Sequence, residues 1–235
     1  MAVLIAPNEP RTGYRFTVDQ YKDMIDSGLF VDAEEVELRD GQVRLTNRRG
    51  GSTPYRFSLD QYHRMIAAGV LDEDDRVEFL HGEVVPKMPQ GDPHAFGIEQ
   101  LNRLLIRLVS DDVSVRCQCP VTIGEDEPEP DFVLCVRPEK RENRHPRAEH
   151  TFLIVEIADS SLEFDRTEKM GTYARAGIPV YWIVNLEDRL IEVYTDPAVA
   201  DSRYGRRTGY GLGQDVPVIV AGVEVGRIEV SAVLR

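Results

Sequence analysis

An internal duplication restricts the fold of this chain more than any other feature. Residues 14–43 (copy one) align with residues 55–84 (copy two) at a shift of 41, with 13 identities over 30 positions. In copy one, Thr17 is a typical N-cap before a short amphipathic stretch, and Asp40-Gly41 is a typical hairpin turn. Two copies are too few for a repeat array, which needs about three or more stacked units. The sequence therefore predicts a duplicated helix–hairpin at the N-terminus.

The segment between the two copies predicts a domain boundary. Residues 46–54, TNRRGGSTP, are polar and contain adjacent glycines, which is typical of a linker. We therefore expect copy two to begin the main domain, residues 51–235, and copy one to be an appended duplicate within residues 1–50.

Composition excludes several classes of protein. The net charge of −13 argues against a protein that coats nucleic acid by general electrostatic attraction, but it is compatible with a nuclease that has local basic patches. No apolar run approaches the roughly 18–20 residues of a membrane span, and the N-terminus lacks the basic region of a signal peptide. We therefore expect a cytoplasmic protein with no membrane partner.

Three cysteines without a Cys-x-x-Cys pair argue against a disulfide framework or a structural zinc site.

The main domain contains both helix and strand patterns. Residues 93–109 carry apolar side chains at helical spacing, and a second helix is expected at 166–176, with Asp165 as its N-cap and Glu168 in the capping-box position. Strands are expected at 114–123, 131–136, 151–158, 180–185 and 190–195, with further strand-like pieces near the C-terminus. These elements predict an α/β or α+β fold in which helices cover a sheet.

Glu156 lies in the middle of the apolar strand FLIVEIA, where burying a carboxylate is costly unless a cation compensates it. One interpretation is an edge-strand glutamate paired with an arginine. The other is a metal site, because Asp131 begins the 131–136 strand and two carboxylates from neighbouring strands can hold a divalent cation. Lys169, on the following helix, would then orient the attacking water or offset charge on a phosphate. Spacing alone leaves both interpretations open.

An ordered series of motifs extends through the second copy and the main domain. The series consists of VEFLHGEVV (77–85), His94, Pro130-Asp131, Val155-Glu156-Ile157, Lys169, Tyr173, Gly177 and YWIVN (181–185). With these motifs in this order, roughly residues 55–195 closely resemble the Uma family of restriction-type endonucleases, in the PD-(D/E)xK nuclease superfamily. The resemblance implies a restriction-endonuclease-like fold, with a mixed central sheet flanked by helices. It also implies metal-dependent hydrolysis of phosphodiester bonds in DNA.

The resemblance assigns catalytic roles residue by residue. Asp131 and Glu156 correspond to the metal ligands, for Mg²⁺ or Mn²⁺, and Lys169 corresponds to the catalytic lysine. The usual superfamily pattern has this lysine two residues after the glutamate, where this chain has Ala158. The Uma family departs from the pattern in the same way and has its lysine on the next helix.

Three further residues are candidates for the same site. Glu78 could add a carboxylate, although Glu37 holds the same position in copy one, which has none of the downstream motifs. His94 starts a helix, so it could approach the metal or the phosphate, or serve as a cap or packing residue. Tyr173 lies four residues after Lys169, on the same helical face, and could orient the lysine or pack in the core.

Two basic stretches, residues 137–147 and 202–209, could grip a phosphate backbone or could be solvated loops. The candidate DNA contacts in them are Arg137, Lys140, Arg141, Arg144, Arg206 and Arg207.

Two other functions are also compatible with the sequence. A catalytically degenerate member of the superfamily would keep the fold and bind nucleic acid or protein without cutting. A structural protein would use the repeat copy to form a homo-oligomer such as a dimer, with Asp131 and Glu156 in ordinary ion pairs.

Overall fold

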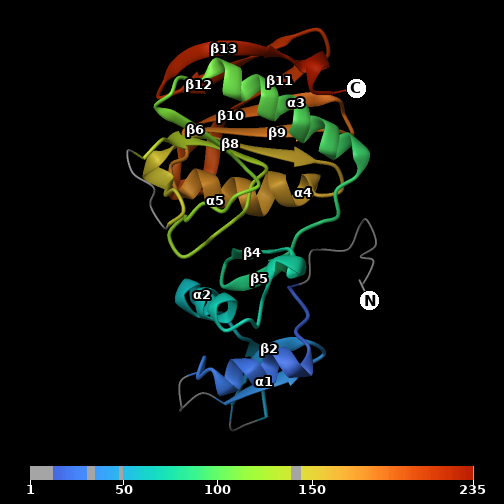
Figure 1. The fold of residues 1–235 in the computed structure, drawn as a ribbon, viewed down its shortest axis with the longest axis vertical. Helices are drawn as coiled ribbons and strands as arrows, with labels where there is room; N and C mark the ends of the chain where they lie inside the picture. The colour runs from blue at the N-terminus through green and yellow to red at the C-terminus, as the bar shows by residue number, and fades with distance from the viewer. Residues whose placement is uncertain (1–12, 31–34, 48–49, 139–143, 235) are drawn as a thin grey trace. The chain divides into compact units, whose positions relative to one another are not determined.

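The computed structural model describes residues 13–30, 35–47, 50–138 and 144–234. The chain divides into two compact units, drawn in Figure 1. The repeat unit comprises Met1–Lys87 and Glu125–Glu127, and the sheet unit comprises Met88–Gly124 and Pro128–Arg235. The expected boundary at residue 50 separates the two copies, whereas in the structure both copies lie in the repeat unit and share one apolar core.

In the repeat unit, each copy folds as a capped helix followed by a hairpin. The side-chain oxygens of Thr17 and Ser58 accept hydrogen bonds from the third residue of each helix and complete a capping box. Both residues of each hairpin turn have positive φ, which is the geometry of a type I′ turn. The elements are α1 (Val18–Asp26), β1 (Val36–Arg39), β2 (Gln42–Thr46), β3 (Ser52–Pro54), α2 (Leu59–Ala67), β4 (Val77–Leu80) and β5 (Glu83–Pro86).

Two segments pair in the repeat unit that the sequence did not predict to be strands. β3 lies in the expected linker and pairs antiparallel with β2, and the amide of Asn47 donates to the carbonyl of Gly51 beside this pair. Residues 125–127 come from far along the chain, and Glu127 exchanges both backbone hydrogen bonds with Phe79 of β4.

The sheet unit contains a six-stranded sheet with the order β11-β10-β9-β8-β7-β6. β8 and β9 are parallel and the other neighbours are antiparallel, so the sheet is mixed. The strands are β6 (Val113–Cys117), β7 (Phe132–Val136), β8 (Thr151–Ala158), β9 (Val180–Asn185), β10 (Leu190–Ala198) and β11 (Arg203–Gly211). A parallel pair needs a crossover connection, which the helical segment between β8 and β9 supplies.

Helices cover both faces of this sheet, as expected (Figure 1). α3 (Asp92–Leu108) packs on one face, where Leu101 and Leu105 meet alternate residues of β7, β8 and β9. The C-terminal hairpin of β12 (Asp215–Val220) and β13 (Val223–Glu229) joins this apolar layer. The helical segment of residues 162–175 covers the other face. No helix in the described ranges has the length and apolar character needed to cross a membrane.

Some boundaries differ from the sequence prediction. The second helical segment begins at Leu162, so Asp165 lies inside it and is not the N-cap; its buried carboxylate instead accepts a hydrogen bond from Ser161 Oγ, 2.6 Å away. The 114–123 strand ends at Cys117, because Gln118 has a φ of 48° and the chain leaves the sheet. β11 was not predicted, since its Gly- and Arg-rich sequence lacks apolar alternation; backbone pairing with β10 makes it a strand.

Candidate active site

Glu156 lies near the C-terminal end of β8, a central strand, and its side chain is almost fully buried. Because side chains alternate along a strand, Glu156 shares a face with Ile154 and Ala158, which pack in the core beneath the 162–175 helical segment. The glutamate is therefore not at a sheet edge. It points toward the helical segment on which Lys169 was predicted to lie.

Lys169 and Tyr173 both contact Glu156. Lys169 Nζ lies 2.9 Å from Glu156 Oε1, and Tyr173 OH donates to the same oxygen at 2.7 Å. All three side chains are buried. The expected neighbourhood of Glu156, Lys169 and Tyr173 is thus present, and the lysine supplies the cation that a buried carboxylate requires.

The backbone around Lys169 is a π-helix, Asp165–Lys169, between α4 (Leu162–Phe164) and α5 (Met170–Arg175). The amide of Met170 donates to the carbonyl of Asp165, five residues earlier. Such π-bulges insert one extra residue into a helix and occur frequently at functional sites. Here the bulge ends at the lysine whose side chain reaches the sheet.

Asp131 immediately precedes β7, where it is buried next to the Glu156 strand. Phe132 pairs with Val155, and Asp131 Oδ2 accepts a hydrogen bond from the amide of Ile157 at 2.7 Å. His94 Nε2, from the first turn of α3, lies 3.2 Å from the same carboxylate oxygen. The two acids thus flank one end of the β7–β8 pair, and His94 joins the group through Asp131.

The pKa of the Asp131 carboxyl is lowered from its ordinary value. Burial by itself would raise this pKa, but the hydrogen bond and charge of His94, the Ile157 amide and the Lys169 ammonium outweigh it. Asp131 is therefore an anion in the folded protein at neutral pH. An ionised carboxylate is what a divalent cation requires as a ligand.

The donor set is compatible with a hard divalent cation that also binds a substrate. Within the described ranges, no group of three or more His, Cys, Asp or Glu side chains is arranged to hold a metal ion. Mg²⁺, however, is usually bound by one or two carboxylates together with waters and substrate phosphates, and Asp131 and Glu156 supply two carboxylates from adjacent strands. A complete cage of protein ligands is therefore not required.

The other predicted site residues lie on other elements. Glu78 is buried on β4 of the repeat unit. Arg137, Arg144 and Arg206 are exposed in the sheet unit, and Arg206 Nε is 3.6 Å from Asp196 Oδ2 on the neighbouring strand. Lys140 and Arg141 lie outside the described residues.

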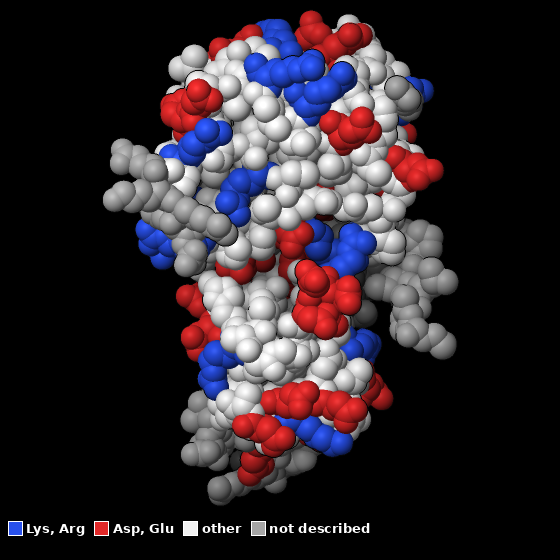
Figure 2. Space-filling view, in the orientation of Figure 1, with Lys and Arg blue, Asp and Glu red and all other residues white. Residues whose placement is uncertain are grey.

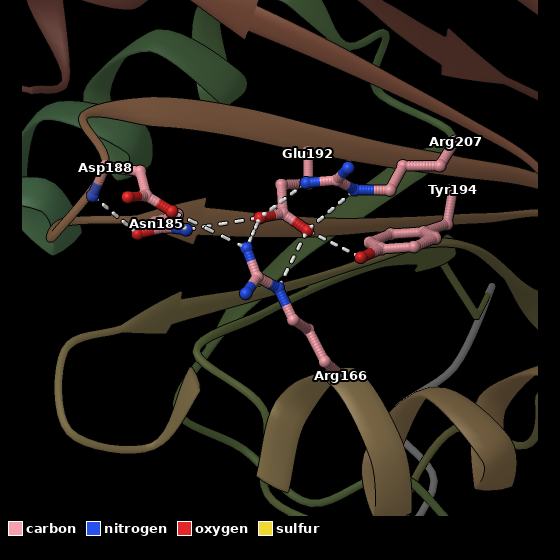
Figure 3. A network of polar contacts seen from close by, with 6 residues as sticks. All are labelled: Arg166, Asn185, Asp188, Glu192, Tyr194 and Arg207. Carbon is pink, nitrogen blue, oxygen red and sulfur yellow. Dashed lines mark hydrogen bonds and ion pairs between the residues drawn. The ribbon is translucent and has the colours of Figure 1, made fainter. Parts of the chain in front are cut away.

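Arg207 belongs to a polar network that the sequence analysis missed (Figure 3). Glu192 of β10 has no exposed surface, and its carboxylate accepts hydrogen bonds from four side chains of the sheet and the π-helix. The donors are Arg166, Asn185, Tyr194 and Arg207. The sequence does contain a signal for Glu192, which is a single glutamate inside the apolar strand LIEVY. The same pattern made Glu156 a candidate site residue.

This network fixes the charge of Glu192 and ties the π-helix to the sheet. Burial by itself would raise the pKa of Glu192, but hydrogen bonds from Arg166, Arg207, Tyr194 and Asn185 lower it to about 2. Burial and the Glu192 carboxylate raise the pKa of Tyr194 to about 12. Arg166 lies three residues before Lys169, so its bond to Glu192 fixes the helical segment that presents the lysine to Glu156.

Charge on the visible surface is mixed. On the face drawn in Figure 2, Lys and Arg atoms of the described residues form separate groups interspersed with Asp and Glu, without one continuous basic surface. This distribution agrees with the net charge of −13. Any contact with a phosphate backbone on this face would therefore depend on local groups of arginines.

Comparison with known protein families identifies the chain. The Uma2 family, described as "Putative restriction endonuclease", matches residues 59–224, which is more than half of the sequence. The chain belongs to the Uma2 family. The match includes Asp131, Glu156, Lys169 and Tyr173, and it begins within copy two of the repeat.

A solved structure has a similar fold. The crystal structure of a "putative nuclease belonging to DUF820" from Anabaena variabilis ATCC 29413 aligns with a TM-score of 0.57 and 15% sequence identity. The alignment covers 75% of this Uma2 chain and 97% of the other chain. No curated protein matches the sequence.

Proposed function

We propose that this Uma2 protein is a metal-dependent DNA endonuclease of the PD-(D/E)xK type. In this proposal Asp131 and Glu156 hold the metal, Mg²⁺ or Mn²⁺, and Lys169 assists at the scissile phosphate. The observation that carries it is the buried contact between Lys169 and Glu156 on β8, the strand whose Ile157 amide also binds the Asp131 carboxylate. Family membership supports the same reaction class.

Each residue has a definite chemical task in this reaction. A divalent cation, when bound, supplies Lewis-acid polarisation of a phosphoryl oxygen. The Lys169 ammonium has three N–H donors, one of which engages Glu156, and its charge offsets the negative charge that develops on the phosphate. Tyr173 fixes the Glu156 carboxylate, and the Ile157 amide and His94 fix that of Asp131. The exposed residues Arg137, Arg144, Arg206 and Arg207 are the described candidates for contact with the DNA backbone.

A second candidate function is a nuclease-fold protein that binds nucleic acid or another protein without cutting. The observation in its favour is that Lys169 and Tyr173 already neutralise and bind the Glu156 carboxylate, as they would in a purely structural ion pair. The two functions differ in metal binding, because a structural ion pair between Lys169 and Glu156 does not require a metal ion.

Metal titration combined with a cleavage assay tests the proposal. We would titrate Mg²⁺ and Mn²⁺ calorimetrically into wild type and Glu156→Gln, and then incubate both with plasmid and single-stranded DNA. Glu163→Gln, the same change at an exposed position on α4, is the matched control. We expect binding and cutting in wild type and in the control, and neither in Glu156→Gln. Binding without cutting would favour the second candidate, and no metal binding in wild type would overturn the proposed site.

A further inference from the structure

The two copies in the repeat unit contact each other through equivalent residues. Gln20 Nε2 donates to the carbonyl oxygen of Val70 at 2.9 Å, and Gln61 Nε2 donates to that of Leu29 at 3.0 Å. Gln20 corresponds to Gln61, and Leu29 to Val70, at the shift of 41 that relates the copies. Each copy therefore gives its partner the contact that it receives.

The two copies also exchange equivalent backbone hydrogen bonds. The amide of Tyr14 donates to Val84 O at 2.7 Å, and the amide of Tyr55 donates to Val43 O at 2.9 Å. The two pairs are equivalent, because the shift of 41 relates Tyr14 to Tyr55 and Val43 to Val84. The segment before each helix thus donates a backbone hydrogen bond to the hairpin of the other copy.

One aromatic pair joins a residue to its own equivalent. The rings of Phe16 and Phe57 lie 6.0 Å apart, edge to face, in the shared apolar core. Contact between equivalent residues, together with exchanged contacts around them, is the signature of an isologous interface with two-fold symmetry. In this unit both halves of that interface belong to one chain.

We propose that the face of copy two that contacts copy one, which includes Phe57, Gln61 and Val70, is a self-association face. Within one chain copy one occupies this face, and copy two of a second molecule fits it in the same way. The reciprocal contacts identify copy two of a second molecule as the occupant, because copy two carries both the donor and the acceptor of each exchanged hydrogen bond. Copy two has the side-chain donor Gln61 and the backbone acceptor Val70. It also has the backbone donor Tyr55 and the backbone acceptor Val84.

One difference between the copies predicts which pairing is favoured. The Arg64 guanidinium donates to the carbonyl oxygens of Ser27 and Gly28, at 3.3 and 2.6 Å, at the C-terminal end of α1. A cation is favourable there, because the end of a helix carries partial negative charge. The equivalent residue in copy one is Asp23, which can neither donate nor neutralise that charge. An interface between the second repeat copies of two molecules would therefore contain the arginine contact twice. An interface between their first repeat copies would lack it.

Paired variants of the full chain test this proposal. Phe16→Asp with Met24→Asp places charge in the core of copy one and frees the face of copy two, since both side chains are buried there. We expect a two-fold increase in mass relative to wild type in sedimentation or light scattering. Adding Arg64→Asp to this variant should return the mass to that of wild type. The matched change in the other copy, Phe57→Asp with Met65→Asp, should not increase the mass.

Far-UV circular dichroism shows whether a variant keeps the helices and hairpins of the repeat unit. Fluorescence of the single tryptophan, Trp182, reports only on the sheet unit in which it is buried. A copy-one variant with the circular dichroism spectrum of wild type and an unchanged mass would overturn the proposal. So would a doubled mass that survives Arg64→Asp.

A second variant keeps every core residue of the repeat. Deleting residues 47–51 joins β2 directly to β3, so the two strands can no longer reverse and pair within one chain. Copy one then no longer covers the face of copy two within its own chain. This face is open to a second chain, and a two-fold mass is again expected. A folded deletion variant with the mass of wild type would contradict the proposal.

Discussion

Lys169 Nζ lies 2.9 Å from Glu156 Oε1, and both side chains are almost fully buried. This contact explains how a central strand of the sheet tolerates a glutamate. It also places a cation beside a carboxylate that the proposed reaction uses as a metal ligand, so the ammonium and the metal compete for one group.

That competition predicts opposite effects of Lys169→Met on binding and on catalysis. Removing the ammonium leaves Glu156 more available to a cation, so we expect tighter Mg²⁺ binding by calorimetry. DNA cleavage should fall by about 100-fold or more, since a group that offsets charge on the phosphate is lost. The free energy of unfolding should fall by about 3 kcal/mol without metal, because a buried carboxylate loses its counter-ion. Unchanged cleavage would remove Lys169 from the proposed mechanism.

Tyr173→Phe removes only the hydroxyl that donates to Glu156 Oε1 at 2.7 Å. Hydrogen bonds to charged groups contribute about 2 kcal/mol, so urea unfolding should show a loss of that size. Cleavage should fall by less than about ten-fold, because the lysine and both acids remain. A larger loss of cleavage with the same stability would give the tyrosine a direct catalytic role.

Glu192 predicts how stability depends on pH. Its pKa is about 2 in the folded protein, below the ordinary value of 4.5, so the unfolded state binds a proton first as the pH falls. Its contribution is complete above pH 4.5 and is lost as the pH falls toward 2. We expect Glu192→Gln to lower stability at pH 7 by about 2 kcal/mol and to weaken the pH dependence within this window. Parallel acid-unfolding curves for the two proteins would contradict the prediction.

Arg206 and Arg207 are neighbours on β11 with different surroundings, which makes them a matched pair. The side chains of both are exposed, by 71% for Arg206 and 52% for Arg207. Arg207 donates to the buried Glu192 at 3.1 Å, whereas Arg206 lies 3.6 Å from the exposed Asp196. Arg207→Ala should lower the free energy of unfolding by about 1–2 kcal/mol. Arg206→Ala should leave stability unchanged and weaken DNA binding in a salt-dependent manner. Equal DNA affinity of Arg206→Ala and wild type would remove Arg206 from the proposed DNA contact.

Local sequence patterns were sufficient to predict most of the elements. Caps such as Thr17, turns such as Asp40-Gly41 and strands such as 151–158 depend on residues only a few positions apart, so the sequence shows them directly. The same holds for the prediction that Glu156 needs a cation, which rests on the cost of burying charge within one apolar strand.

The sequence alone determined the family resemblance, the mixed helix-and-sheet class and the candidate group of Asp131, Glu156 and Lys169. Only the tertiary structure decided that the two copies share one core, that β11 completes the sheet, and that Glu192 collects Arg166 and Arg207. These features depend on contacts between segments far apart in the chain. Such contacts are set by packing and by the pairing of buried polar groups, which no local pattern specifies.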